Sequence, residues 1–124
     1  MFNKILVPIF SIHQISEVLH QAINLATSHG GQLVILSVFE KKSSKKIFSE
    51  SITTVIDSAK VRSGIDCLLI SKAGKALAKI CDIANELKVD LIVIGVKDIS
   101  LESSSQSTAS RVISLANCPV FIVP

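Results

Sequence analysis

The sequence predicts an α/β protein in which a five-stranded parallel sheet is covered on its two faces by four helices. Short apolar runs alternate strictly with segments whose apolar residues recur at helical spacing. The runs are apolar throughout, which is typical of parallel strands that are buried on both faces. The length of 124 residues is that of one ordinary domain. We therefore expect a single domain over residues 1–124.

The predicted strands are short runs rich in valine, isoleucine and leucine. They span residues 4–9, 33–39, 66–71, 91–94 and 120–123. Connections between parallel strands are right-handed, and ligands in such folds bind beyond the carboxyl ends of the strands. The candidate site therefore includes the residues that end or follow the first, second and fourth strands, namely Ile9, Phe10, Val38, Phe39 and Gly95 onward.

Each segment between two strands places its apolar residues on one face of a helix. These stripes run over residues 15–26, 48–59, 77–87 and 109–116. Gly30 and Gly31 follow the first stripe, and Gly64 follows the second. Glycine is the usual residue just beyond the end of a helix, so these positions predict the ends of the first two helices.

The net charge of +3 comes from the segment KKSSKK at residues 41–46. Without its four lysines the chain has nine basic and ten acidic residues. The segment is either an anion, nucleic-acid or headgroup patch, or a solvated linker between a strand and a helix. We interpret it as a linker, because no aromatic residues are interleaved with the lysines for stacking on bases. Neither a nucleic acid nor a membrane is therefore expected as a partner.

Composition and cysteine spacing predict a cytoplasmic protein. Hydrophobic residues make up 48% and charged residues 19% of the chain, which excludes a disordered tail. No uncharged apolar run reaches the length needed to cross a bilayer, and the N-terminus lacks the features of a signal peptide. The spacing of Cys67, Cys81 and Cys118 matches neither a zinc site nor a redox motif, which predicts buried thiols in a reducing compartment.

Neither a catalytic centre nor a metal site is predicted. The sequence contains no nucleophile elbow with a Ser-His-Asp order, no recognisable pair of carboxylates and no complete P-loop. His13, Glu17 and His20 share helical spacing, but no further residue completes a coordination shell. We interpret the two histidines as solvated or partly packed side chains.

Four segments resemble the universal stress protein family over essentially the whole chain. They are KILVPI near the start, HGGQLVILSV, ANELKVDLIVIG and the final ANCPVFIVP. The resemblance implies an adenine nucleotide alpha hydrolase-like fold with strand order 3-2-1-4-5, a homodimer joined through the last strands, and a role in stress survival. Some members of this family bind ATP and others do not.

Nucleotide-binding members carry a glycine, two residues, a second glycine, nine residues, a third glycine and then serine or threonine. Gly95 matches the first position, whereas Asp98 stands at the second. Aligned backwards from Cys118, the third position falls on Gln106, and the loop is about two residues shorter than the family pattern. A carboxylate about 5 Å from a phosphate costs on the order of 3 kcal/mol at a dielectric near 20, roughly a hundredfold in affinity.

Nucleotide-binding members usually carry an aspartate two residues after the proline of the first strand. Here Pro8 is followed by Ile9 and Phe10, and a phenyl ring cannot accept a hydrogen bond from a ribose or an adenine. Hydroxyls and backbone amides at the start of the last predicted helix have two interpretations. They either bind an anion such as a phosphate, or they cap the N-terminus of that helix. By resemblance, the candidate nucleotide-binding residues are Pro8, Phe10, Val38, Gly95, Lys97, Ser107 and Thr108.

The function predicted from the sequence is that of a dimeric binding or interaction module in stress response, with ATP binding weakened or lost. No cofactor is expected, although ATP or AMP with magnesium stays open. The first alternative is an adenine-nucleotide switch or slow ATPase that uses the loop from Gly95 to Thr108. The second is an anion or membrane-surface adaptor that uses the lysine segment. The expected dimer strand comprises Pro119, Val120, Phe121, Ile122 and Val123, because an apolar edge strand requires cover.

Overall fold

Five parallel strands form one sheet in the order β3-β2-β1-β4-β5. The computed structural model describes residues 2–11, 14–15, 17–40, 42–96 and 108–124. The strands are β1 (Lys4–Ile9), β2 (Gln32–Phe39), β3 (Asp66–Ala73), β4 (Leu91–Gly95) and β5 (Val120–Val123). The predicted fold class and strand order are confirmed.

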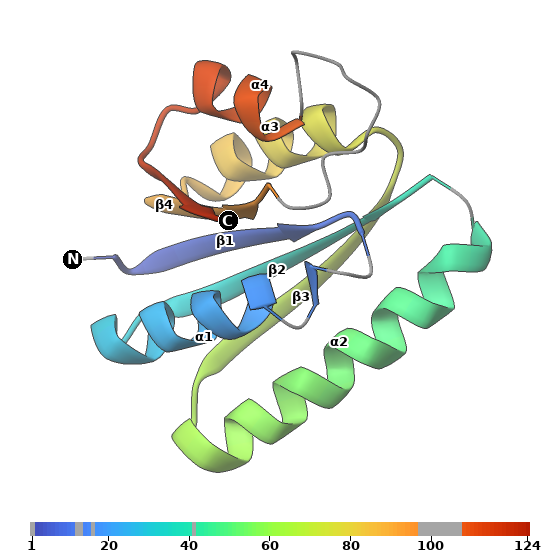
Figure 1. Cartoon of the computed structure of the whole chain (residues 1–124). Coiled ribbons are helices and arrows are strands. Elements are labelled where there is room, and N and C mark those ends of the chain that lie inside the picture. Colours follow the sequence, from blue (N-terminus) through green and yellow to red (C-terminus); the bar gives the residue numbers. More distant parts are fainter. Residues whose placement is uncertain (1, 12–13, 16, 41, 97–107) are drawn as a thin grey trace.

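In the part of the chain that the structure describes, four helices cover the two faces of the sheet, as predicted. They are α1 (Glu17–His29), α2 (Lys42–Ser63), α3 (Ala76–Leu87) and α4 (Thr108–Leu115). Helices α1 and α2 lie on one face, and α3 and α4 lie on the other (Figure 1). Each face has its own apolar cluster. Successive residues of a strand point to opposite faces, so every second strand residue packs against the buried side of the helices on that face. In the described part of the chain, no helix is both long enough and apolar enough to cross a membrane.

Strands β1 and β4 are paired near their amino ends but not at their carboxyl ends. Strand β1 is in register with β2 over six positions, from Lys4 to Ile9, but with β4 only at Ile5 and Leu6. Pro8 lies in β1 beyond the last of these pairs, and proline has no N–H to donate to a neighbouring strand. The order of the strands reverses at this point, which is where ligands bind in open α/β sheets.

The amino ends of the same two strands are held together by Asp90, directly before β4. Its carboxylate accepts hydrogen bonds from the backbone N–H groups of Asn3 at 2.9 Å and Lys4 at 3.2 Å. The Asp90 N–H in turn donates to the Lys4 carbonyl at 2.9 Å. Asp90 therefore sets the starts of β1 and β4 side by side.

The prediction that KKSSKK forms a linker is wrong for residues 42–46, because α2 begins at Lys42. Lysine has a high helix propensity, and serine costs little near the start of a helix. Lys46 also lies 4.0 Å from Glu50, a pair at i and i+4 that supports a helix. The segment has no apolar stripe, so hydrophobic periodicity failed to detect its first turns.

Candidate functional site

Three of the predicted nucleotide-site residues lie at the carboxyl ends of β1, β2 and β4. Phe10 directly follows β1, is half-buried and packs against the apolar cluster under α3 and α4. Val38, near the end of β2, belongs to the same cluster and is 3% exposed. Gly95 is the last residue of β4. The fold thus brings these three residues to one end of the sheet, as their positions after the strands predict.

The other predicted residues of this site are less closely defined. Pro8 is buried within β1, in register with Leu36 of β2. Thr108 is the first residue of α4 and is half-buried. Lys97 and Ser107 lie outside the described residues, as do Asp98 and Gln106.

Gln14 is a part of this end that the sequence did not reveal. Its side chain is 3% exposed, and its Oε1 atom accepts a hydrogen bond from the Phe10 N–H at 2.9 Å. The Gln14 N–H donates to the carbonyl of Ser11 at 3.1 Å. Gln14 therefore closes the turn after β1 and occupies a backbone donor that would otherwise face the end of the sheet. Its only signal in the sequence is a polar residue directly before an apolar helical stripe.

Gly95 is a glycine because α1 passes close to its backbone. A Cβ atom at this position would lie 2.5 Å from Cγ2 of Val18 and 3.8 Å from Cγ of Gln14. The valine side chain is stiff about χ1, so it cannot easily swing away. Close packing of helix on strand therefore explains this glycine without a phosphate contact.

A buried hydroxyl lies near the same end of β2, on the opposite face of the sheet. Ser37 is fully buried, and its Oγ atom has no hydrogen-bond partner within the described structure. Its register neighbours are Ile9 in β1 and Ser71 in β3. Because alternate residues of a strand face opposite sides, Ser37 points away from the face that Val38 lines.

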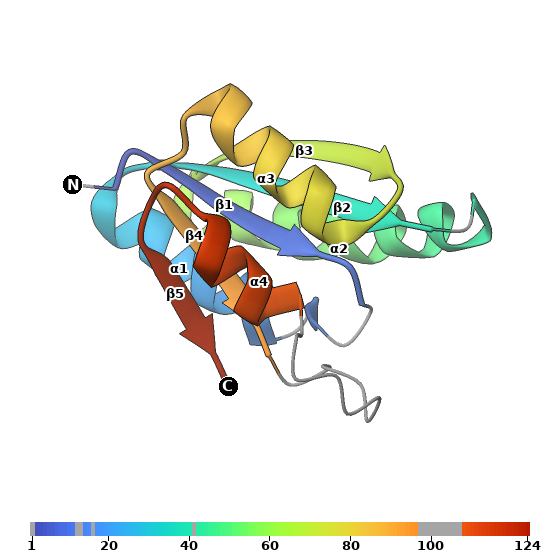
Figure 2. The same ribbon diagram turned by 90° about the horizontal axis from the view of Figure 1, so that it is seen from above.

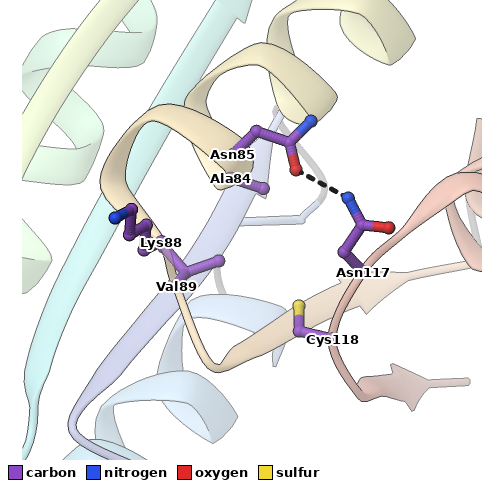
Figure 3. A pocket seen from close by; sticks show the side chains of 6 residues that line it. All are labelled: Ala84, Asn85, Lys88, Val89, Asn117 and Cys118. Atoms are coloured by element: carbon purple, nitrogen blue, oxygen red, sulfur yellow. Dashed lines mark hydrogen bonds between the residues drawn. The ribbon is translucent and has the colours of Figure 1, made fainter.

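A pocket of about 240 Å³ lies at the opposite, amino end of β4 and β5. It is lined by Ala84, Asn85, Lys88, Val89, Asn117 and Cys118. Across it, the Asn117 Nδ2 group donates a hydrogen bond to Asn85 Oδ1 at 3.0 Å, which ties the end of α3 to the turn before β5 (Figure 3). The ligand site that the fold predicts lies at the carboxyl ends of the strands, so this pocket is at the other end of the sheet.

The cysteines have the properties of packed thiols. Cys67, Cys81 and Cys118 are half-buried and unpaired. Burial raises the pKa of the Cys118 thiol, and the Asp90 carboxylate raises it further. Burial also raises the pKa of Cys67 and of Cys81. All three thiols are therefore protonated at neutral pH, which makes them poor nucleophiles and poor metal ligands.

Among the described residues, no group of three or more His, Cys, Asp or Glu side chains is placed to hold a metal ion. His20 and Glu17 are exposed on α1, and His13 lies outside the described part of the chain.

Strand β5 forms one edge of the sheet. Within the described residues it pairs with β4 alone, from Val120 opposite Ile92 to Val123 opposite Gly95. Phe121 is 42% exposed and Ile122 is 37% exposed, and successive residues of a strand point to opposite faces. Of the other predicted dimer residues, Pro119 is exposed, Val120 is half-buried and Val123 is buried.

Known proteins share this sequence and this architecture. A model of the universal stress protein family matches residues 1–124. Universal stress protein Sll1654 of Synechocystis is 32% identical, in an alignment that covers 100% of this chain and 87% of that protein.

Solved structures of universal stress proteins have the same fold. The one in complex with cAMP has a TM-score of 0.82 at 19% identity, covering 98% of this chain and 96% of its own. UspA from Lactobacillus plantarum has a TM-score of 0.72 at 24% identity, and the match covers 99% of this chain and 98% of UspA. The Archaeoglobus fulgidus universal stress protein in complex with dAMP also has a TM-score of 0.72, at 22% identity, and the match covers 99% of this chain and 98% of that protein. The chain therefore belongs to the universal stress protein family.

Proposed function

We propose that this universal stress protein acts in stress response as a dimeric binding module in which ATP binding is weak or lost. The observation that carries the proposal is Phe10. It lies half-buried against an apolar cluster at the end of β1, where the family resemblance places an aspartate in nucleotide-binding members. A nucleotide at this end would meet a phenyl ring, which offers no acceptor to a ribose hydroxyl or an adenine amino group.

The surroundings of Phe10 support the same proposal. Its N–H is already bonded to the buried Gln14 side chain, and replacing that bond would leave a buried amide oxygen without a donor. Gly95, which matches the first glycine of the nucleotide motif, is required by the approach of Val18. Its presence therefore gives no independent support for a phosphate contact.

The loop sequence adds an electrostatic argument. Asp98 and Gln106 replace the second and third glycines of the motif. Glycines allow backbone amides to approach phosphates closely, and an aspartate adds a repelling charge. Both changes weaken the binding of a triphosphate more than that of an uncharged ligand.

A nucleotide-dependent switch or slow ATPase is the second candidate function. It is favoured by the hydroxyl of Thr108 at the first residue of α4, because a helix N-terminus attracts anions. Relatives with the same fold have been solved with cAMP and with dAMP. This candidate requires the loop between Gly95 and Thr108 to bind phosphate despite Asp98.

The proposed dimer joins the β5 strands of two copies. Phe121 and Ile122 are exposed on an edge strand of only four residues. An apolar edge with unpaired backbone groups favours pairing with another strand, and a second copy supplies an identical one. Pro119 and Pro124, on either side of β5, limit extension of the pairing beyond this strand.

Binding of a fluorescent ATP analogue with Mg²⁺, followed by polarisation, separates the two candidates. The weak-binding proposal predicts that D98G binds up to roughly a hundredfold more tightly than the wild type, since it removes one repelling charge. F10D should also bind more tightly, whereas the matched variant F10L should not. Thermal unfolding of each variant checks that it is folded.

The switch predicts a different pattern in the same assay. It requires tight binding by the wild type, and S107A should weaken that binding. Micromolar affinity in the wild type would overturn the weak-binding proposal.

A further inference from the structure

Five lysines from three elements gather at the carboxyl ends of β2 and β3. This lysine surface consists of Lys45, Lys46, Lys72, Lys75 and Lys79. The first two lie in the early turns of α2, the third near the end of β3, and the others at and after the start of α3. Figures 1 and 2 both place the beginning of α2 beyond the ends of these two strands.

Contacts around Phe39 connect the two sides of the lysine surface. The Nζ atom of Lys45 lies 5.9 Å from the centre of the Phe39 ring. Phe39 is in register with Ala73, and its carbonyl accepts the Gly74 N–H at 3.0 Å. Lys72 and Lys75 flank Ala73 and Gly74 in the chain. The Lys45 ammonium group therefore lies near the ends of β2 and β3, next to which Lys72 and Lys75 stand in the chain.

Lys79 is held against the same turn. A Cβ atom on Gly74 would lie 2.9 Å from Cε of Lys79, so the lysine side chain passes directly over this glycine. Lys79 is half-buried, while Lys72 and Lys75 are exposed. Its stem packs on the turn in the way that long cationic side chains cover apolar surface while their charge stays in water.

The charge of the molecule is concentrated at this end. The five lysines of the surface stand with two glutamates of the same segments, Glu40 and Glu50, a balance of +3. The rest of the chain has eight basic and eight acidic residues, a balance of 0. Of the two glutamates, Glu50 lies 4.0 Å from Lys46 and Glu40 is exposed. The next acid along α3 is Asp82, beyond Lys79.

We propose that the lysine surface docks this protein on an anionic lipid bilayer. Lysines are compact charges that suit dispersed anionic headgroups, and each one near such a surface adds to the attraction. Ile47, 53% exposed in the same part of α2, gives the surface an apolar side chain that can enter the boundary between headgroups and acyl chains.

A lipid surface fits these residues better than a nucleic acid does. Binding of single strands depends on aromatic rings that stack on bases. Phe39, the aromatic ring beside Lys45, is 7% exposed and is therefore covered. The proposal does not require nucleotide binding, because none of the five lysines is among the candidate nucleotide-site residues, although Lys72 is in register with Val38 of that site.

The sequence alone led to the opposite expectation. KKSSKK considered by itself predicts a solvated linker and no membrane partner. Lys72, Lys75 and Lys79 are about 30 residues further along the chain, and only the parallel pairing of β2 with β3 brings them to the same end.

Sedimentation with vesicles tests the proposal on the full chain. The protein should bind vesicles that contain phosphatidylserine but not vesicles of phosphatidylcholine alone, and added salt should release it. Each lysine removed should lower the partition coefficient about fivefold, so K72Q/K75Q/K79Q should lose roughly a hundredfold. The matched triple variant K60Q/R62Q/R111Q, which removes the same charge elsewhere, should lose much less.

The apolar contribution is tested by a second pair of variants on one helix. I47S should weaken vesicle binding, whereas V61S, which changes a residue 88% exposed near the other end of α2, should not. No binding to the anionic vesicles, or equal losses in the two triple variants, would overturn the proposal. Binding to single-stranded RNA but not to these vesicles would assign the surface to nucleic acid instead.

Discussion

Gly95 illustrates how one residue can satisfy a motif for a reason unrelated to the motif. In the family pattern, a glycine here permits close approach to a phosphate. In this chain, a side chain at the same position would run into Val18 on α1. Close packing of a helix on a strand and close approach of a ligand both exclude a Cβ atom, so a sequence cannot distinguish them.

Gly95→Ala should therefore lower the free energy of unfolding even without a ligand. The added methyl group meets Cγ2 of Val18 at 2.5 Å, and overpacking of this kind costs about 1–3 kcal/mol. Urea unfolding monitored by circular dichroism measures the loss.

The Val18→Ala background provides the control for this change. Removing the valine methyls makes room for the new side chain, so Gly95→Ala should cost less there than in the wild type. Equal costs in the two backgrounds would show that Val18 does not require the glycine.

The predicted site residues show what a sequence can locate. Phe10, Val38 and Gly95 could be placed at one end of the sheet because they end or follow strands predicted to be parallel. The rule that ligands bind beyond the carboxyl ends of such strands makes that end the candidate site. The bond from Phe10 to Gln14 could not be predicted, because it depends on how tightly the chain turns between β1 and α1. Side-chain contacts in turns have no periodic signal in a sequence.

At the scale of elements, β1 and β4 are fastened at one end and separate at the other. Asp90 binds the N–H groups of Asn3 and Lys4 at the amino ends. Beyond Leu6 the register between β1 and β4 ceases, and Pro8 has no donor with which to extend it. Asp90 thus fastens the amino ends of the two strands, and Pro8 lies where their pairing has ended.

Asp90→Ala should destabilise the protein by about 1–3 kcal/mol, because two backbone donors lose a charged acceptor. Asp90→Asn should lose less, since its amide oxygen still accepts one bond. Asp66→Ala is a suitable control, because Asp66 accepts only an exposed bond of 3.4 Å from Gln32 among the contacts described. Chemical denaturation compares the three, and a loss in Asp66→Ala as large as in Asp90→Ala would contradict the role given to Asp90.

The elements were predictable where apolar periodicity marks them. All five strands and the buried stripes of four helices appear in the sequence as apolar patterns. The first turns of α2 were missed because they contain lysine and serine with no apolar stripe. The apolar run predicts that β3 ends at Ser71, two residues before its observed end, because Lys72 and Ala73 lie at an edge where burial no longer selects apolar residues.

At the scale of the molecule, the two edges of the sheet differ. Strand β3 is eight residues long and ends at the lysine surface. Strand β5 is four residues long and exposes Phe121 and Ile122. Lysines discourage pairing between edge strands, whereas an uncharged apolar edge invites it. This difference is why we propose a dimer through β5.

Sedimentation velocity tests this proposal. The wild type should be a dimer at micromolar concentration, and Phe121→Lys and Ile122→Lys should dissociate it, because each places a charge in an apolar interface. Leu68→Lys is the matched control, since Leu68 is 41% exposed on the other edge strand. A monomeric wild type, or dissociation of the Leu68→Lys variant, would contradict a dimer through β5.

The central claim is that this member of the universal stress protein family keeps the fold while its nucleotide site is altered. Calorimetric titration of the wild-type protein with ATP and Mg²⁺ tests it most directly. We expect no saturable heat at micromolar ATP, because Phe10 and Asp98 replace groups that favour a nucleotide. A saturable transition with a micromolar dissociation constant would contradict the claim.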